Sequence, residues 1–391
     1  MKVAMLLACS SFEGYFVKLQ GQTTRTYLEK YRNDWAWYYG GALVENGITP
    51  ILYIPSHEEE GRFKTETGIE VRFLPLRRWY KPLDNRWVKR LCRTNRFSLY
   101  LDDRLNTMAF MSSLKAGLEE DGVDLLYVQE YWNGRFDHIV SRVDVPVTAA
   151  DHGGVARGVL KWFKKSAFAK VPSVYCQSKN ECDIVRRYGG VPILLPNGCD
   201  TKQFDVPEGE NRRKNVLTVV RLINRQKRTT DLIEALAHMS PDWTLDIVGR
   251  GPDLELMQKR AESAGVASRV RFHGFMDRSS VCRMLQTCGV FSMPSDNEAM
   301  ALAALEAMSC GSAVVLSRIR SFEALVEDGV NGRLVNVGDQ RAIAAAIQDA
   351  WENRDRFGRQ AAETVREHFN SEDLYRKLAE TLRQQSLFSR A

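Results

Sequence analysis

Short apolar runs alternate with longer amphipathic stretches along nearly the whole chain. A continuous apolar run of about four to eight residues is typical of a buried strand, and alternation with helical stretches is typical of βαβ units. The first series of predicted strands covers residues 3–8, 50–54, 71–74, 125–129, 147–150, 174–176 and 193–195. The second series covers residues 216–220, 245–248, 270–272, 289–293, 313–316 and 332–335. The pattern therefore predicts two α/β domains, each with a doubly wound parallel sheet.

A polar segment containing both proline and glycine, residues 205–214, separates the two series. Because this composition interrupts regular structure, the segment predicts an interdomain linker. We expect Rossmann-like domains over residues 1–204 and 205–370, and a C-terminal helix over residues 371–391 that packs back on the first domain. Ligands of such sheets collect at the carboxyl ends of the strands, so we expect the chemistry in the cleft between the domains.

Composition narrows the class of protein. The chain has 391 residues, which is long for a single core, and 44% of them are hydrophobic, which excludes wholesale disorder. Its eight cysteines contain no Cys-x-x-Cys pair, which favours reduced thiols in a cytoplasmic protein over disulfides or a zinc site. No apolar run approaches the ~20 residues of a membrane span.

Two glutamates flank seven residues without a polar side chain, since Glu298 and Glu306 enclose residues 299–305. Ala, Leu and Met favour helix, and Asp296-Asn297 supplies a capping signal, which predicts Glu298 at a helix mouth and Glu306 about two turns inside. Carboxylates are seldom buried without a partner. The pair therefore indicates two anchor points for a ligand as long as a sugar nucleotide, and the alternative is two solvated glutamates on a surface helix.

Three further segments follow predicted strands. Arg221 and Lys227 follow the strand at residues 216–220, where they are suited to clamp a diphosphate or form an ordinary basic loop. Gly251 belongs to a Gly-x-Gly turn, which fits either close approach to a ligand or a structural turn. His152 precedes a glycine pair, where it is suited to bond a sugar hydroxyl, steady developing charge or play a structural role.

Taken together, these segments resemble glycosyltransferase family 4, the retaining nucleotide-sugar transferases of the GT-B fold. The matching residues are, in chain order, His152, Pro196-Asn197-Gly198-Cys199-Asp200 with Phe204, Arg221 and Lys227, Val248-Gly249-Arg250-Gly251-Pro252, and Pro294-Ser295 followed by Glu298-Ala299-Met300-Ala301-Leu302, Leu305-Glu306-Ala307-Met308 and Gly311. The two glutamates and the residues between them correspond to the E-x7-E signature, which is the most specific part of the resemblance.

The resemblance implies a role for each matching residue. Arg221 and Lys227 would hold the diphosphate and neutralise the leaving group, Glu298 would bond donor-sugar hydroxyls, and His152 would act from the first domain. The donor-binding set would comprise Gly251, Ala299, Met300, Ala301, Leu302 and Glu306, with Glu306 on the ribose hydroxyls. The resemblance assigns the acceptor to residues 1–204 and the donor to residues 205–370. It implies no metal and no cofactor besides a UDP- or GDP-linked co-substrate, and the chain has no Asp-x-Asp pair.

The first half departs from the family pattern, because relatives place a Gly-Gly pair soon after the first strand. Here only the separated Gly14 and Gly21 occupy that loop, and they are weak candidates for the acceptor or phosphate side. Glu130 and Trp132 follow a predicted strand and are suited to bond and stack on an acceptor sugar. An ordinary aromatic loop explains them equally well.

Basic and aromatic residues gather in residues 77–97, which contain a single acid, Asp84. From Arg86 onward the cations recur at helical spacing, which predicts a basic amphipathic helix. Such a helix either docks on the inner face of a membrane or presents a solvated face while it packs on the first domain. No nucleic-acid-binding module surrounds it, so we expect no nucleic-acid partner.

The prediction from sequence is a retaining glycosyltransferase that moves a sugar from a UDP- or GDP-sugar to a glycan, glycolipid or small-molecule acceptor. The expected setting is the synthesis of cell-surface polysaccharide or glycolipid. Two alternatives remain open. One is a non-catalytic binding or regulatory subunit with the same fold, and the other is a GT-B sugar-nucleotide epimerase.

Overall fold

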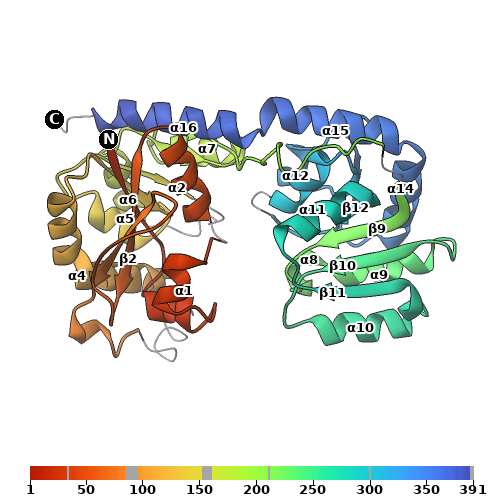
Figure 1. The fold of residues 1–391 in the computed structure, drawn as a ribbon, viewed down its shortest axis with the longest axis horizontal. Coiled ribbons are helices and arrows are strands. Elements are labelled where there is room, and N and C mark those ends of the chain that lie inside the picture. The colour runs from red at the N-terminus through yellow and green to blue at the C-terminus, as the bar shows by residue number, and fades with distance from the viewer. Residues whose placement is uncertain (33–34, 85–95, 152–160, 210–211, 299–300, 388–391) are drawn as a thin grey trace. The chain divides into compact units, whose positions relative to one another are not determined.

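The computed structural model describes residues 1–32, 35–84, 96–151, 161–209, 212–298 and 301–387. The chain divides into two compact units (Figure 1). Unit 1 comprises Met1–Leu195 and Tyr375–Ala391, and unit 2 comprises Pro196–Leu374. Unit 2 starts before the expected domain boundary at residue 204, because Cys199 forms a β-bridge with Asn370 and Phe204 is buried in the core of unit 2.

Unit 1 contains an eight-stranded sheet with the order β3-β4-β2-β1-β5-β6-β7-β8. The strands are β1 (Lys2–Leu6), β2 (Thr49–Ser56), β3 (Gly61–Lys64), β4 (Glu70–Pro75), β5 (Leu125–Gln129), β6 (Val147–Ala150), β7 (Val174–Cys176) and β8 (Pro192–Leu194). All strand pairs are parallel except β3–β4. The seven strands expected from the apolar runs are present. The antiparallel edge strand β3 was missed because its Gly-Arg-Phe-Lys sequence is largely exposed and has no apolar run.

The helices of unit 1 surround this sheet. They are η1 (Glu13–Val17), α1 (Thr24–Glu29), α2 (Trp35–Glu45), η2 (Arg78–Tyr80), α4 (Arg96–Glu120), α5 (Gly134–Ile139), α6 (Lys161–Phe168) and α7 (Lys179–Arg187). The last helix, α16 (Ser371–Ser386), begins in unit 2 and supplies its remaining residues to unit 1. There the Tyr175 hydroxyl lies 2.7 Å from the Thr381 hydroxyl, and the Tyr375 ring lies 5.1 Å from that of Tyr39.

A buried ion pair fastens the edge of this sheet to the end of α4. Asp121 has a fully buried side chain that accepts hydrogen bonds from Tyr53 at 2.6 Å and from the Arg72 Nη2 atom at 2.6 Å. These partners oppose the effect of burial and hold the pKa of Asp121 below its usual value. The ionised carboxylate is therefore the stable form in the folded protein.

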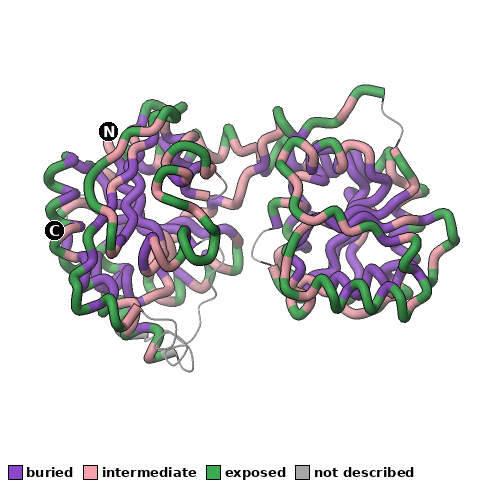
Figure 2. Tube along the Cα trace, turned by 60° about the horizontal axis from the view of Figure 1, so that its bottom comes forward, coloured by how far each residue is buried: buried purple, intermediate pink, exposed green. Residues whose placement is uncertain are grey.

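Unit 2 contains a six-stranded parallel sheet with the order β11-β10-β9-β12-β13-β14. The strands are β9 (Arg213–Val219), β10 (Thr244–Val248), β11 (Val270–Gly274), β12 (Cys288–Met293), β13 (Ala313–Ser317) and β14 (Arg333–Val335), all of which the apolar runs predicted. Figure 2 shows these strands as a buried centre under a mostly exposed surface.

Helices cover both faces of the second sheet. They are α8 (Asn224–Lys227), α9 (Thr229–Ala237), α10 (Leu254–Ser263), η3 (Ala267–Arg269), α11 (Arg278–Thr287), α12 (Leu302–Ser309), α13 (Arg320–Glu323), α14 (Gln340–Glu352) and α15 (Arg354–His368). Helices α11, α12 and α15 form one layer, and α9, α10 and α14 form the other (Figure 1). Both sheets are thus doubly wound, as expected.

The predicted amphipathic helix between residues 86 and 97 lies mostly outside the described residues. Before this gap, Arg77, Arg78 and Lys81 are exposed, together with Trp79. Within the described ranges, no helix has both the length and the apolar composition that a membrane crossing requires.

Candidate functional site

The strand order of unit 2 changes direction at β9, which lies between β10 and β12. At such a switch point the loops that leave two neighbouring strands diverge, and the crevice between them is the usual ligand site of an open α/β sheet. Arg221 and Lys227 follow β9, and Glu298 follows β12. The topology therefore brings three of the predicted site residues to the same edge of one sheet.

The loop after β9 is held by the Gly-x-Gly turn after β10. The amide of Leu222 donates to the Arg250 carbonyl at 3.0 Å, and the amide of Asn224 donates to the Asp253 carboxylate at 2.7 Å. A Cβ on Gly251 would lie 2.3 Å from the Leu222 carbonyl oxygen, so only glycine lets the two loops approach this closely. These contacts favour the structural interpretation of the turn. Gly251 acts by positioning residues 221–228, which include α8 and are called the basic loop below.

Lys227 and Glu298 form an ion pair across the switch point. The Lys227 Nζ atom lies 2.5 Å from the Glu298 Oε1 atom, and only 15% and 8% of the two side chains are exposed. Two contacts beside the pair join the same loops, because the amide of Asp296 donates to the Gln226 carbonyl at 2.8 Å and the Gln226 side chain donates to the Asn297 carbonyl at 3.2 Å. Arg221, on the same basic loop, is exposed to solvent.

Glu298 was expected at the mouth of a helix, and it lies in a loop four positions before α12 begins. Helix α12 begins at Leu302, with Ala301 as its extended N-cap, so Glu298 stands in the loop before the helix. The bonds of Asp296, Asn297 and Glu298 to α8 hold this segment out of helical geometry. Ala301 is buried and Leu302 is exposed, whereas Ala299 and Met300 lie outside the described residues.

Glu306 lies inside α12, as expected, with 14% of its side chain exposed. Burial raises its pKa to about 7, against the opposing effect of Arg278. The Arg278 Nη2 atom lies 3.4 Å from the carboxylate, and its guanidinium carbon lies 4.9 Å from the centre of the Phe204 ring. Arg278 was not predicted as a site residue, because it belongs to α11 and no motif connects it to Glu306.

The candidates in unit 1 fall into two groups. Glu130 follows β5 with a backbone φ of 64°, which is strained for a residue other than glycine, and its amide donates to the Ala150 carbonyl at 2.7 Å. Burial and the neighbouring Asp151 raise the pKa of Glu130 to about 7. The Trp132 ring instead packs edge-on against Phe168, with ring centres 5.7 Å apart, which favours the interpretation as an ordinary aromatic residue.

The remaining predicted positions carry less information. Gly14 lies in η1, where its amide donates to the Ser11 hydroxyl at 3.2 Å, and Gly21 has a φ of 66° that favours glycine. His152 lies outside the described residues. Among the described residues, no three His, Cys, Asp or Glu side chains are grouped as a metal site would require.

Comparison with known proteins places this site in a wider context. Residues 200–368, which include both glutamates and the basic loop, match the family model for glycosyl transferases group 1. A phosphatidyl-myo-inositol mannosyltransferase of Mycolicibacterium smegmatis is 33% identical over 178 residues, which are 42% of this chain and 45% of the relative. The lipopolysaccharide core biosynthesis glycosyltransferase LpsE of Rhizobium meliloti is 32% identical over 197 residues, or 50% and 55% of the two chains. The chain thus spans about half the length of the curated relatives it matches.

Solved structures extend the comparison to the whole chain. A sucrose-phosphate synthase from Thermosynechococcus elongatus aligns with a TM-score of 0.73 at 19% identity and covers 98% of both chains. HepE of Anabaena, solved in complex with UDP, aligns with a TM-score of 0.69 at 17% identity over 98% of this chain and 100% of its own. The chain therefore has the GT-B fold, and its residues 200–368 match the glycosyl transferases of group 1.

Proposed function

We propose that this protein is a retaining glycosyltransferase of family 4 that needs no metal. It transfers a sugar from a UDP- or GDP-sugar to a glycan, a lipid-linked acceptor or a small molecule. The names of the relatives support this proposal, because they include transferases of a phosphatidylinositol mannoside and of a lipopolysaccharide core. They also support a setting in the synthesis of cell-surface glycans or glycolipids. The proposal further places the protein at the inner face of the membrane.

The ion pair of Lys227 with Glu298 carries the proposal. An ammonium group has three donors, and Glu298 is close to one of them, so two remain for phosphate oxygens. Arg221 presents a guanidinium fork from the same loop, which suits a diphosphate. Negative charge builds up on the departing nucleotide during transfer, and cations fixed in advance lower that barrier because they need no reorganisation.

In this proposal the two glutamates bind different parts of the donor, the sugar and the ribose. Glu298 is held beside the ammonium group, where it is suited to accept hydrogen bonds from hydroxyls of the sugar next to the diphosphate. Glu306 is suited to accept hydrogen bonds from the ribose hydroxyls, and the backbone amide of Ala301, the N-cap of α12, adds a donor. Under this proposal Glu130 belongs to the acceptor side, and His152 acts in catalysis from the first domain.

Release of the nucleotide from a panel of UDP- and GDP-sugars tests the proposal. The expected result is slow release of UDP or GDP from one donor, reduced about 100-fold or more in Lys227→Ala. Arg225→Ala is the matched control, since Arg225 is an exposed cation of the same loop that forms no part of the proposed site. Failure of every donor to bind or release its nucleotide would overturn the proposal.

The same panel separates the alternatives. Binding without release would identify a binding or regulatory subunit, and conversion of the sugar without transfer would identify an epimerase. The roles of the glutamates are tested by calorimetry with UDP and GDP alone. Glu306→Ala is expected to weaken nucleotide binding, whereas Glu298→Ala is expected to preserve it and to slow transfer of the sugar.

A further inference from the structure

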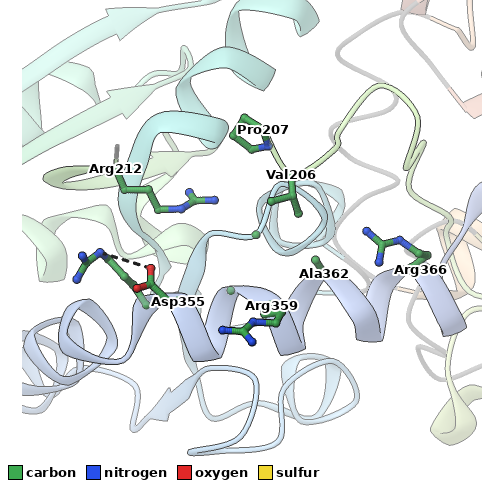
Figure 3. Close-up of a pocket in the computed structure, with 10 residues that line it drawn as sticks. Val206, Pro207, Arg212, Asp355, Arg359, Ala362 and Arg366 are labelled. Carbon is green, nitrogen blue, oxygen red and sulfur yellow. Dashed lines mark ion pairs between the residues drawn. The ribbon is translucent and has the colours of Figure 1, made fainter. Parts of the chain in front are cut away.

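A hollow of about 330 Å³ lies in unit 2, and none of the site residues described above lines it (Figure 3). Arg212 lines it immediately before β9 begins, and Gly311 lines it two residues before β13 begins. These positions are at the amino ends of the strands, whereas Lys227 and Glu298 follow their carboxyl ends. Because the strands are parallel, the hollow and the proposed donor site lie at opposite edges of the same sheet.

Arg212 supplies a fixed positive charge at this hollow. Its Nη1 atom donates to the carbonyls of Leu285 at 3.2 Å and Cys288 at 3.0 Å, and its Nη2 atom donates to the Cys310 carbonyl at 2.6 Å. It also lies 3.3 Å from the Ser312 hydroxyl. All these acceptors are neutral, and burial lowers the pKa of Arg212. The guanidinium is thus held rigidly, and none of its hydrogen-bond acceptors among the described residues is a carboxylate.

Helix α15 contributes more cations to the same hollow. Arg359 and Arg366 lie on one face of the helix, two turns and roughly 10 Å apart along its axis, and both are exposed. Gly358 lets this helix lie directly on the backbone before β13, because a Cβ there would be 2.1 Å from the Gly311 carbonyl oxygen. In Figure 3 the side chains of Arg212 and Arg366 both point toward the space beside Val206.

The charges around the hollow are strongly unbalanced. Of its ten lining residues, all within the described part of the chain, four are arginines and one is an acid. The fourth arginine, Arg354, lies 3.9 Å from the carboxylate of that acid, Asp355, whose side chain is 81% exposed. A single exposed carboxylate offsets little of this charge, because solvent screens it.

We propose that this hollow binds a ligand with two or more phosphate groups, at a site separate from that of the sugar nucleotide. Guanidinium groups match phosphate oxygens in a planar, two-bond geometry. The distance between Arg359 and Arg366 along α15 exceeds the size of one phosphate. A ligand that contacts both arginines therefore needs at least two phosphate groups. The volume lies near the lower end of about 300–1,000 Å³ for small-molecule sites, which suits a diphosphate with little attached. Either a free diphosphate or a phosphorylated lipid headgroup has this chemistry.

Calorimetry with inorganic pyrophosphate tests the first source. The protein used is the full chain carrying Arg221→Ala and Lys227→Ala, so that the proposed donor site does not contribute. Binding is expected to persist in this background and to weaken about tenfold on adding either Arg359→Ala or Arg366→Ala. Arg341→Ala is the charge-matched control, since Arg341 is exposed on α14 and does not line the hollow.

Vesicles of phosphatidylcholine with and without phosphatidylinositol 4-phosphate test the second source. Binding that requires this lipid and is lost in Arg359→Ala and Arg366→Ala, but not in Arg341→Ala, would support the site and assign it to a headgroup. Equal losses in all three variants would attribute binding to diffuse charge and overturn the proposal. Absence of binding to both probes would also overturn it. UDP or GDP binding measured with Arg221 and Lys227 intact stays unchanged in the α15 variants if the two sites are separate.

Discussion

Replacing Glu306 by glutamine removes an ionisable group from the proposed ribose site while keeping its shape. The pKa of Glu306 is about 7 because the side chain is largely buried, even with Arg278 at 3.4 Å. The free protein therefore carries Glu306 about nine-tenths protonated at pH 6 and about nine-tenths ionised at pH 8. Two ribose hydroxyls that donate to this side chain favour the carboxylate over the acid.

The magnitude follows from proton linkage. If the nucleotide binds the carboxylate and returns its pKa toward the usual 4.5, binding at pH 6 must first remove a proton. The affinity of the wild-type protein for UDP or GDP is then about tenfold lower at pH 6 than at pH 8. In Glu306→Gln this contribution is absent. At pH 8 the variant binds about tenfold more weakly than the wild type, because charge-assisted hydrogen bonds are lost.

Calorimetry at pH 6, 7 and 8, in two buffers with different heats of ionisation, measures both the affinity and the proton released. The terminal phosphate of the nucleotide also titrates near pH 6. Its effect is common to both proteins, so the difference between wild type and variant isolates Glu306. Identical pH profiles for the two proteins, or an affinity that rises toward pH 6 in the wild type alone, would refute the reasoning.

Urea unfolding provides the control for this variant. The folded-state pKa of Glu306 lies above its unfolded value of about 4.5, because burial favours the protonated acid. The contribution of this acid to the free energy of unfolding is therefore complete below pH 4.5 and is lost as the pH rises through 7. Glu306→Gln avoids that loss. Its free energy of unfolding at pH 8 is expected to exceed that of the wild type by up to about 3 kcal/mol, which separates weaker binding from a damaged fold.

Three further predictions concern stability, measured by urea unfolding. Gly249→Ala is expected to lower the free energy of unfolding by about 2–4 kcal/mol, because the φ of Gly249 is 139° and a Cβ there would lie 1.8 Å from a carbonyl oxygen. The control Gly41→Ala, in open space within α2, is expected not to lower it. Asp121→Asn is expected to lower the free energy of unfolding by about 3–5 kcal/mol, because Arg72 loses its buried, charged partner. In the wild type the same contribution to stability is expected to disappear as the pH falls through the lowered pKa of Asp121. Trp132→Ala is expected to lose about 3 kcal/mol without changing nucleotide release, since that ring packs on other aromatic rings, and a selective defect with the acceptor would contradict this.

The strands could be predicted because most of them are buried runs of apolar residues, a local property of the sequence. The exposed edge strand β3 has no such run, and only its pairing with β4 defines it. The loop position of Glu298 could not be predicted, because it depends on bonds from Glu298 and Asn297 to α8, some 70 residues earlier. Local preference decides such a boundary only where no distant partner competes for the segment.

In the proposed donor site, too, some residues could be predicted from local sequence and others depend on distant contacts. Its residues could be proposed from motifs, because each follows a strand whose position is evident, and the topology places Lys227 and Glu298 at neighbouring strand ends. Their supporting residues carry no such signal. Asp253 fixes the basic loop through a backbone amide, and Arg278 reaches Glu306 from another helix. These contacts depend on the angles between packed elements, which the spacing of residues along the chain does not encode.

The division of α16 between the two units has a consequence for the order of folding. Unit 2 is one continuous segment, Pro196–Leu374, so it has all its strands as soon as that segment has been synthesised. Unit 1 needs residues that follow it in the chain, because Ser173 and Tyr175 bond to Gln385 and Thr381, and Asn46 bonds to Arg383, 337 positions away. Unit 1 therefore completes its fold only after the last residues of α16 have been synthesised, whereas every residue of unit 2 precedes them.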